Sequence, residues 1–218
     1  SNRSDNSSKN DSPNKTTESP YHKKIKTTNT YPLIAIGSSS GGPKALKKVL
    51  TGFPEDFPAA FLIVQHMPAG FTASLAKHLN QACNIQVKEA EENDSIKKGT
   101  ALIAPGDYHM EVNQNRTISL NQKPPNWGVR PCVDYMMTST AKVYRKRVIG
   151  VILTGMGHDG GRGMEEIKKY NGYGIVEDKS TALVYGMPST TIEKGAYDEI
   201  LPLDQIPQNI IKLIERRY

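Results

Sequence analysis

The segment Leu33–Pro43 reads Leu-Ile-Ala-Ile-Gly-Ser-Ser-Ser-Gly-Gly-Pro and decides the fold. Its four apolar residues predict a strand that is buried on both faces, as in a parallel sheet. Pro43 is favoured at the first position of a helix. Three serines therefore lie between the carboxyl end of a strand and the amino end of a helix, where open α/β sheets bind ligands and where free N–H groups attract negative charge. The segment is expected either to hold a phosphate or to present a serine nucleophile.

Alternating strands and helices are expected along the rest of the chain. Apolar runs predict strands at 59–64, 85–90, 99–104, 148–153, 174–177 and 199–201. Helical spacing predicts helices at 43–50, from Phe71 through Leu79, and at 133–143 and 163–170. A further helix is expected after Gly186-Met187-Pro188, to about Lys194, and a last helix is capped by Asp204. Residues 109–120 alternate like a hairpin. This order predicts an α/β fold with one doubly wound, mostly parallel, Rossmann-like sheet and an antiparallel hairpin inserted near its edge.

The composition divides the 218 residues into a tail and one domain. Residues 1–30 contain only two hydrophobic residues, Tyr21 and Ile25, so we expect a disordered linker there and one folded domain over residues 31–218. Half of the formal net charge of +6 falls within residues 1–30, which leaves the domain mildly basic. Because no basic block is interleaved with aromatic residues, nucleic acid is not an expected partner.

The cysteines, histidines and apolar runs argue against a metal-binding, a secreted or a membrane-spanning protein. Cys83 and Cys132 lie far apart, and no two histidines have the spacing of metal ligands, so we expect no metal. The sequence has no signal peptide and no run of 18 apolar residues. A cytoplasmic protein without direct membrane insertion is therefore expected.

Three predicted strands are followed by the residue types that form the catalytic site of a serine hydrolase. Ser39 follows the first strand, His66 the second, and Asp159 the strand at 148–153. In a parallel sheet these ends meet at one edge. A histidine can take the proton of a serine hydroxyl, and a carboxylate can orient that histidine and stabilise its charged form.

Each of these residues also has a simpler interpretation. The serine turn fits the short G-x-S-x-G pattern but is also a small-residue turn before a helix. His66 taken alone is a structural histidine, and Asp159 taken alone is an N-cap of the helix that follows it. The G-x-G-x-x-G and P-loop spacings are absent, which weakens the phosphate alternative. Because Ser39, His66 and Asp159 all follow predicted strands, the sequence favours a serine nucleophile over these simpler interpretations.

Six segments, in this order, resemble the catalytic domain of the CheB-type protein-glutamate methylesterases of chemotaxis. They are residues 34–42, 65–71, 103–110, 130–134, 151–160 and 186–188. The resemblance implies a Ser-His-Asp triad of Ser39, His66 and Asp159, in that chain order. It implies an oxyanion donor in the main-chain N–H of Met156, with assistance from Ser40. No cofactor is implied.

The same resemblance implies the reaction and the partners. The expected activity is hydrolysis of glutamate methyl esters, and deamidation of glutamines, on methyl-accepting chemotaxis receptors through an acyl-enzyme. Members of the family usually carry a receiver domain before this one. Here only a linker-like segment precedes it, so we expect an isolated catalytic portion or a natural single-domain form.

This sequence departs from the family pattern at three positions. Ser38 stands where alanine is frequent and Ser40 where threonine is usual, which leaves two further hydroxyls beside Ser39. His158 stands where asparagine is common and adds a titratable group near the triad. The alternatives that the sequence leaves open are a nucleotide- or phosphate-binding module without covalent chemistry and a non-enzymatic docking domain.

Overall fold

The protein is described by a computed structural model over residues 31–218; the linker expected at residues 1–30 lies outside the described residues. Seven strands form one sheet in the order β3-β4-β2-β1-β7-β8-β9, and each neighbouring pair is parallel. The strands are β1 Leu33–Ser38, β2 Ala60–Gln65, β3 Gln86–Glu89, β4 Thr100–Ile103, β7 Val148–Ile152, β8 Tyr173–Glu177 and β9 Glu199–Leu201.

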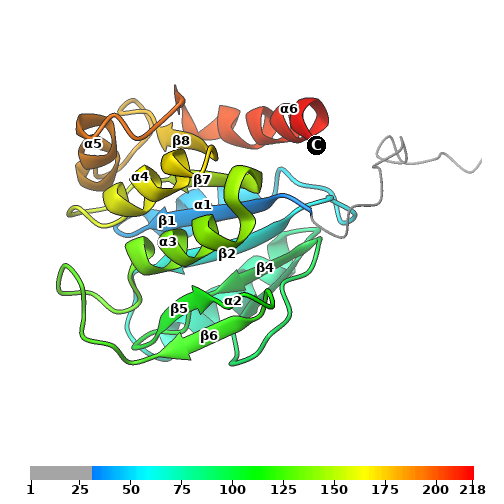
Figure 1. The fold of residues 1–218 in the computed structure, drawn as a ribbon, viewed down its shortest axis with the longest axis vertical. Helices are drawn as coiled ribbons and strands as arrows, with labels where there is room; N and C mark the ends of the chain where they lie inside the picture. Colours follow the sequence, from blue (N-terminus) through cyan, green and yellow to red (C-terminus); the bar gives the residue numbers. More distant parts are fainter. Residues whose placement is uncertain (1–30) are drawn as a thin grey trace, which may run out of the picture.

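Helices cover both faces of this sheet (Figure 1). They are α1 Gly42–Leu50, α2 Phe71–Ala82, α3 Val133–Tyr144, α4 Gly161–Lys169, α5 Gly186–Glu193 and α6 Ile206–Arg217. Side chains alternate along the strands, so that Ile34 and Ile36 join one core with α1, α2 and α6, while Leu33 and Ala35 join a second core with α3, α4 and α5. Burial on both faces explains the uninterrupted apolar runs of the central strands.

The hairpin forms a sheet of its own. Its strands β5 His109–Val112 and β6 Ile118–Asn121 pair with each other in antiparallel register. Met110 and Ile118 are fully buried in the core that contains α3. The predicted doubly wound sheet with an antiparallel hairpin is therefore confirmed.

The predicted helix from Phe71 is confirmed, whereas the predicted cap of the last helix is wrong. Phe71 is 60% exposed, although Leu75 and Leu79 are buried as expected. Residues 68–70 before it are exposed too, so the first turn of α2 lies outside the core. Asp204 does not cap α6, because it lies in a short 3-10 turn and Gln205 occupies the N-cap position.

The order of the strands reverses at β1. The chain runs from β1 to β2 and outward to the strands on that side, then returns to place β7 on the other side of β1. The carboxyl ends of strands at such a reversal form the crevice where ligands bind in α/β sheets. Over residues 31–218, no helix is long and apolar enough to cross a lipid bilayer.

Candidate active site

The three predicted site residues lie at the ends of three neighbouring strands. Ser39 follows β1, His66 follows β2, and Asp159 lies in the turn between β7 and α4. Since β1 pairs with both β2 and β7, the sheet places these three turns along one short stretch of its carboxyl edge.

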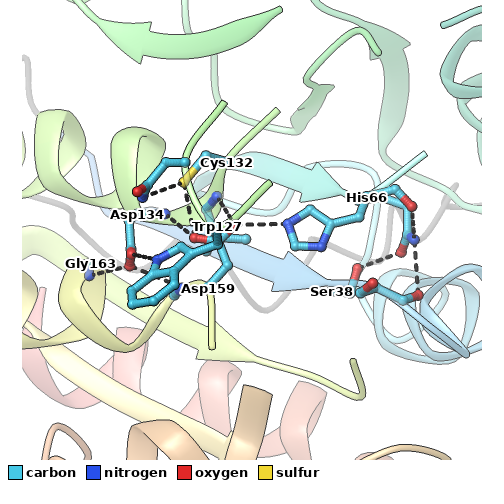
Figure 2. A network of polar contacts seen from close by, with 12 residues as sticks. Ser38, His66, Trp127, Cys132, Asp134, Asp159 and Gly163 are labelled. Carbon is cyan, nitrogen blue, oxygen red and sulfur yellow. Dashed lines mark hydrogen bonds and ion pairs between the residues drawn. The ribbon is translucent and has the colours of Figure 1, made fainter. Parts of the chain in front are cut away.

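His66 and Asp159 form a nearly buried pair (Figure 2). The distance between His66 Nε2 and Asp159 Oδ2 is 2.8 Å, and the side chains are 11% and 2% exposed. An ionised carboxylate can only accept, so Nε2 carries the proton and donates it to Asp159. The second ring nitrogen, Nδ1, then has its lone pair available as a base.

The Asp159 carboxylate is also bound to the start of α3. It accepts the main-chain N–H groups of Val133 at 2.6 Å and Asp134 at 2.9 Å, and the thiol of Cys132 at 3.0 Å. Asp159 therefore caps α3 and not the helix that follows it, since Gly160 holds the N-cap position of α4. A helix N-terminus stabilises negative charge.

These contacts explain how a buried carboxylate stays ionised. Burial alone raises the pKa of Asp159, but the hydrogen bond and charge of His66, with the donors at the start of α3, lower it below its ordinary value. Burial and the nearby Asp159 carboxylate raise the pKa of the Cys132 thiol. The thiol therefore stays protonated and remains a donor to Asp159.

We predict that Asp159→Asn destabilises the protein strongly at neutral pH and much less in acid. Because the folded-state pKa of Asp159 lies below its unfolded value of about 4, the stability that it adds is present above that value and is lost as the pH falls through the folded pKa. Urea denaturation of both proteins at several pH values measures the difference in the free energy of unfolding.

The control for this measurement is Asp204→Asn, which removes the same charge from an exposed side chain. Its effect on the free energy of unfolding is expected to be small at every pH. A difference between wild type and Asp159→Asn that stays constant from neutral pH to pH values well below 4 would contradict the assigned direction of the pKa shift.

The three serines differ sharply in environment. Ser38 is fully buried and donates its hydroxyl to Gln65 Oε1 at 2.7 Å. Ser39 is half-buried and Ser40 is exposed. Because the Ser38 hydroxyl is enclosed and already bonded, only Ser39 and Ser40 are accessible to a substrate.

Main-chain contacts hold the Ser39 turn. The Ser39 N–H donates to Thr154 O at 3.0 Å, and the Thr154 hydroxyl donates to Ser40 O at 2.8 Å. Gly41 has a φ of 84°, which favours glycine. A Cβ on Gly155 would lie 3.0 Å from Ser39 Cβ, so the turn after β7 approaches the serine closely.

Gln65 ties the serine turn to the histidine. Its Nε2 donates to Ser39 O at 2.9 Å and to His66 O at 3.1 Å, while its Oε1 accepts from Ser38. The side chain is 2% exposed, so these bonds are shielded from water. Gln65 thereby fixes the backbone of the proposed nucleophile relative to that of the proposed base.

The side chains of Ser39 and His66 are not hydrogen-bonded to each other. Within residues 31–218, the Ser39 hydroxyl makes no hydrogen bond with the His66 ring. Such bonds are commonly long in enzymes without substrate and tighten in the complex. The N–H groups of Ser40 and Met156 likewise have no acceptor in the described part of the chain, so both are available to a bound oxygen.

Two residues of the matching segment 130–134 also have partners here. Arg130 pairs with Asp107 at 2.6 Å on the surface. Asp134 is 6% exposed and accepts bonds from Trp127, Gly160 and Gly163. No sequence pattern indicated Trp127 as a partner of this network. Gln65 belongs to the matching segment 65–71, but no pattern indicated its role.

His158 lies beside this network without joining the triad. It is exposed, and its Nδ1 lies 2.9 Å from the Thr190 hydroxyl. Cys132, Asp134 and Asp159 place possible ligand atoms within 4.8 Å of one another. Both carboxylates are already occupied by protein donors, so these three residues act as a hydrogen-bonding group rather than an open ion site.

Comparisons with known proteins agree on one family. A family model described as CheB methylesterase matches residues 34–210. A protein-glutamate methylesterase/protein-glutamine glutaminase of Pyrococcus horikoshii is 49% identical over 185 residues, which cover 84% of this chain and 50% of that protein. The protein of the same name in Clostridium acetobutylicum is 45% identical over 181 residues, covering 83% and 52%. The chain thus spans about half the length of these relatives.

The fold also matches a solved structure. The crystal structure of the Thermotoga maritima CheB methylesterase catalytic domain superposes with a TM-score of 0.82 at 43% sequence identity. The match covers 84% of this chain and 99% of that chain.

Proposed function

The chain belongs to the CheB methylesterase family, and from this premise we propose that it hydrolyses glutamate methyl esters on chemotaxis receptors. The relatives named above carry both an esterase and a glutaminase activity in their names, so deamidation of receptor glutamines is part of the proposal. Residues 31–218 would be the catalytic domain.

The single observation that supports this function best is the pair of His66 and Asp159 beside the Ser39 turn. A phosphate site needs N–H donors at a helix start but has no use for a histidine oriented by a buried carboxylate. An ester hydrolase needs that pair to activate a hydroxyl.

The reaction begins when the Ser39 hydroxyl attacks the ester carbonyl. His66 Nδ1 accepts the hydroxyl proton, and Asp159 stabilises the resulting imidazolium through the bond to Nε2. The new Ser39 Oγ–carbon bond places negative charge on the former carbonyl oxygen. The unpaired N–H groups of Ser40 and Met156 are the proposed donors to this oxyanion.

The intermediate then collapses in two stages. His66 returns its proton to the leaving oxygen, methanol departs, and an acyl-enzyme on Ser39 remains. Water deprotonated by His66 attacks the acyl carbonyl, and Ser39 leaves with the proton, which yields the free glutamate. An amide substrate follows the same path with ammonia as the leaving group. The proposed steps use only groups of this chain and need no metal or cofactor.

The carboxyl edge of the sheet also offers a surface for a protein substrate. Exposed large apolar side chains follow four of the parallel strands there: Phe71, Tyr108, Met156 and Leu183. Exposed apolar groups near a site are typical of protein contact surfaces. We propose that cytoplasmic receptor helices bind across this edge, that the protein acts in the cytoplasm, and that a receiver domain is a further partner.

The proposal is tested with the purified chain and a cytoplasmic receptor fragment whose glutamates carry labelled methyl esters. We expect release of labelled methanol and loss of this activity after treatment with a fluorophosphonate. Peptide mapping is expected to find the phosphonate on Ser39.

The rival function makes the opposite prediction. Calorimetry with ATP and with inorganic phosphate would show tight binding if the Ser39 turn were a phosphate site. Tight binding, together with no methanol release and no phosphonate on Ser39, would replace the proposed function with the binding module.

A further inference from the structure

The two helices beside the candidate site cap each other through a pair of aspartates. Asp159 precedes α4 but accepts the N–H groups at the start of α3, at 2.6 and 2.9 Å. Asp134 lies in the first turn of α3 but accepts the N–H groups of Gly160 at 3.0 Å and Gly163 at 2.7 Å, at the start of α4. The start of each helix is therefore stabilised by a carboxylate that lies at the start of the other helix (Figure 2).

Asp134 forms one hydrogen bond with the Asp159 side chain and another with the peptide bond that follows Asp159. Its main-chain N–H donates to Asp159 Oδ1, and its Oδ1 accepts the N–H of Gly160, the next residue in the chain. The first bond fixes the Asp159 carboxylate, and the second fixes the peptide that carries it. A displacement of Asp134 would therefore move the carboxylate relative to His66.

The second oxygen of Asp134 is held by an aromatic side chain. Trp127 Nε1 donates to Asp134 Oδ2 at 2.8 Å. Trp127 and Gly128 have φ angles of 56° and 74° at the tip of a tight turn closed by Asn126 and Val129. Positive φ at both central residues is the backbone signature of a type I′ turn.

Two further side chains contact the indole. The Arg162 guanidinium lies 4.8 Å from the Trp127 ring centroid, and the His158 ring lies 5.8 Å from it. Trp127 is nevertheless 44% exposed, so it contributes little to the core. Its contacts keep the indole N–H directed at Asp134.

Two neighbouring buried carboxylates carry an energetic cost. Burial and the charge of Asp159 raise the pKa of Asp134. The three hydrogen bonds to Asp134 offset this cost in part. A neutral amide could accept the same two main-chain N–H groups, but its NH₂ would then face the Trp127 N–H with no acceptor between them.

We propose that Asp134, held in place by the Trp127 indole, is a positioning residue that sets the Asp159 carboxylate against His66. This inference rests on the proposed hydrolase function. Trp127 acts on the reaction only through Asp134 and Asp159, so its N–H affects the chemical step and not the binding of substrate.

The test uses Trp127→Phe, which removes the N–H but keeps a ring, together with Asp134→Asn and the double variant. We expect kcat for methanol release to fall about 3- to 10-fold in Trp127→Phe, the effect of one hydrogen bond, with KM unchanged. Asp134→Asn is expected to lower kcat about 10- to 100-fold, as for a misplaced catalytic group. The double variant is expected to be more active than Asp134→Asn, because the clash between the two donors is gone.

Asp198→Asn is the matched control. Asp198 also accepts a main-chain N–H, that of Gly174 at 2.7 Å, and pairs with Lys168, but it lies at the amino end of β8, away from the site. It is expected to lower the melting temperature without changing kcat. If Asp134 had only a structural role, its variants would behave in the same way.

A second measurement does not depend on the substrate. The proton on His66 Nε2, bonded to a carboxylate, should give a resolved downfield NMR signal in wild type. We expect this signal to shift or broaden in Trp127→Phe and Asp134→Asn and to stay unchanged in Asp198→Asn.

The outcomes separate the two proposals. If folded Trp127→Phe and Asp134→Asn keep both the wild-type kcat and the wild-type Nε2 proton signal, the positioning role is overturned. If wild type releases no methanol, the proposed function fails, and the Nε2 signal alone then decides the positioning role.

Discussion

Ser39→Ala is expected to abolish methanol release from a methylated receptor while leaving the fold and its stability unchanged. Loss of a triad nucleophile typically lowers kcat by about 10⁴- to 10⁶-fold. The Ser39 hydroxyl makes no hydrogen bond within the described residues, and the side chain is half-buried, so its removal should change the free energy of unfolding by less than about 0.5 kcal/mol.

Ser38→Ala is the matched control and should behave in the opposite way. Its hydroxyl is fully buried and bonded to Gln65 Oε1, which would lose its donor. The expected cost is about 1–3 kcal/mol of stability, with most of the activity retained at temperatures where the variant is folded. Ser40→Ala should keep both properties, because the proposed role of Ser40 rests on its main-chain N–H.

The two serines can be distinguished by rate assays with the labelled receptor fragment and by urea denaturation. Activity that survives in Ser39→Ala but disappears in Ser38→Ala or Ser40→Ala would move the nucleophile to that other serine. Such a result would also require the hydrogen bond between Ser38 and Gln65 to break in the active protein.

His66→Ala is expected to have an effect on the rate of similar size, about 10⁴- to 10⁶-fold. Without the ring, no group accepts the Ser39 proton, and Asp159 loses the donor at 2.8 Å. The Asp159 carboxylate keeps its bonds to the start of α3, so the domain should still fold. Circular dichroism and methanol release measured on the same sample check both statements.

The orientation of the His66 ring determines which of its nitrogens carries the proton. Because Nε2 faces Asp159, the proposed base is Nδ1, and nitrogen NMR of wild type should find the neutral ring protonated on Nε2. His66→Gln offers a control that keeps a donor near Asp159 without a base. An active His66→Gln variant, or a neutral ring protonated on Nδ1, would contradict the assigned role.

Much of the fold could be predicted because the strands are buried on both faces. The run at Val148–Ile152 has no polar residue, and such a run fits only a central parallel strand once helices surround it. The detail that failed lies at a helix start. Asp204 has the residue type of a helix cap, but the chain around it is wound into a 3-10 turn.

The candidate site could be predicted in part for a similar reason. Ser39, His66 and Asp159 each lie in the turn that follows a recognisable strand, so the parallel topology alone brings these turns together. The partners of Asp159 could not be found in this way, because Asp134 and Trp127 reach it across a helix pair that has no local signature. The same holds for Asp159 itself, which has the position of a cap for α4 but caps α3.

The position of β7 beside β1 has a consequence for synthesis of the protein on the ribosome. His66 and Asp159 are 93 residues apart in sequence, yet they bond across the end of β1. Contacts of such long sequence separation form late in folding, because the intervening chain must first close its loop. An emerging chain that already contains Ser39 and His66 therefore has the proposed nucleophile and the proposed base, but not the carboxylate that orients the base. The proposed hydrolytic activity would appear only after β7 has joined the sheet.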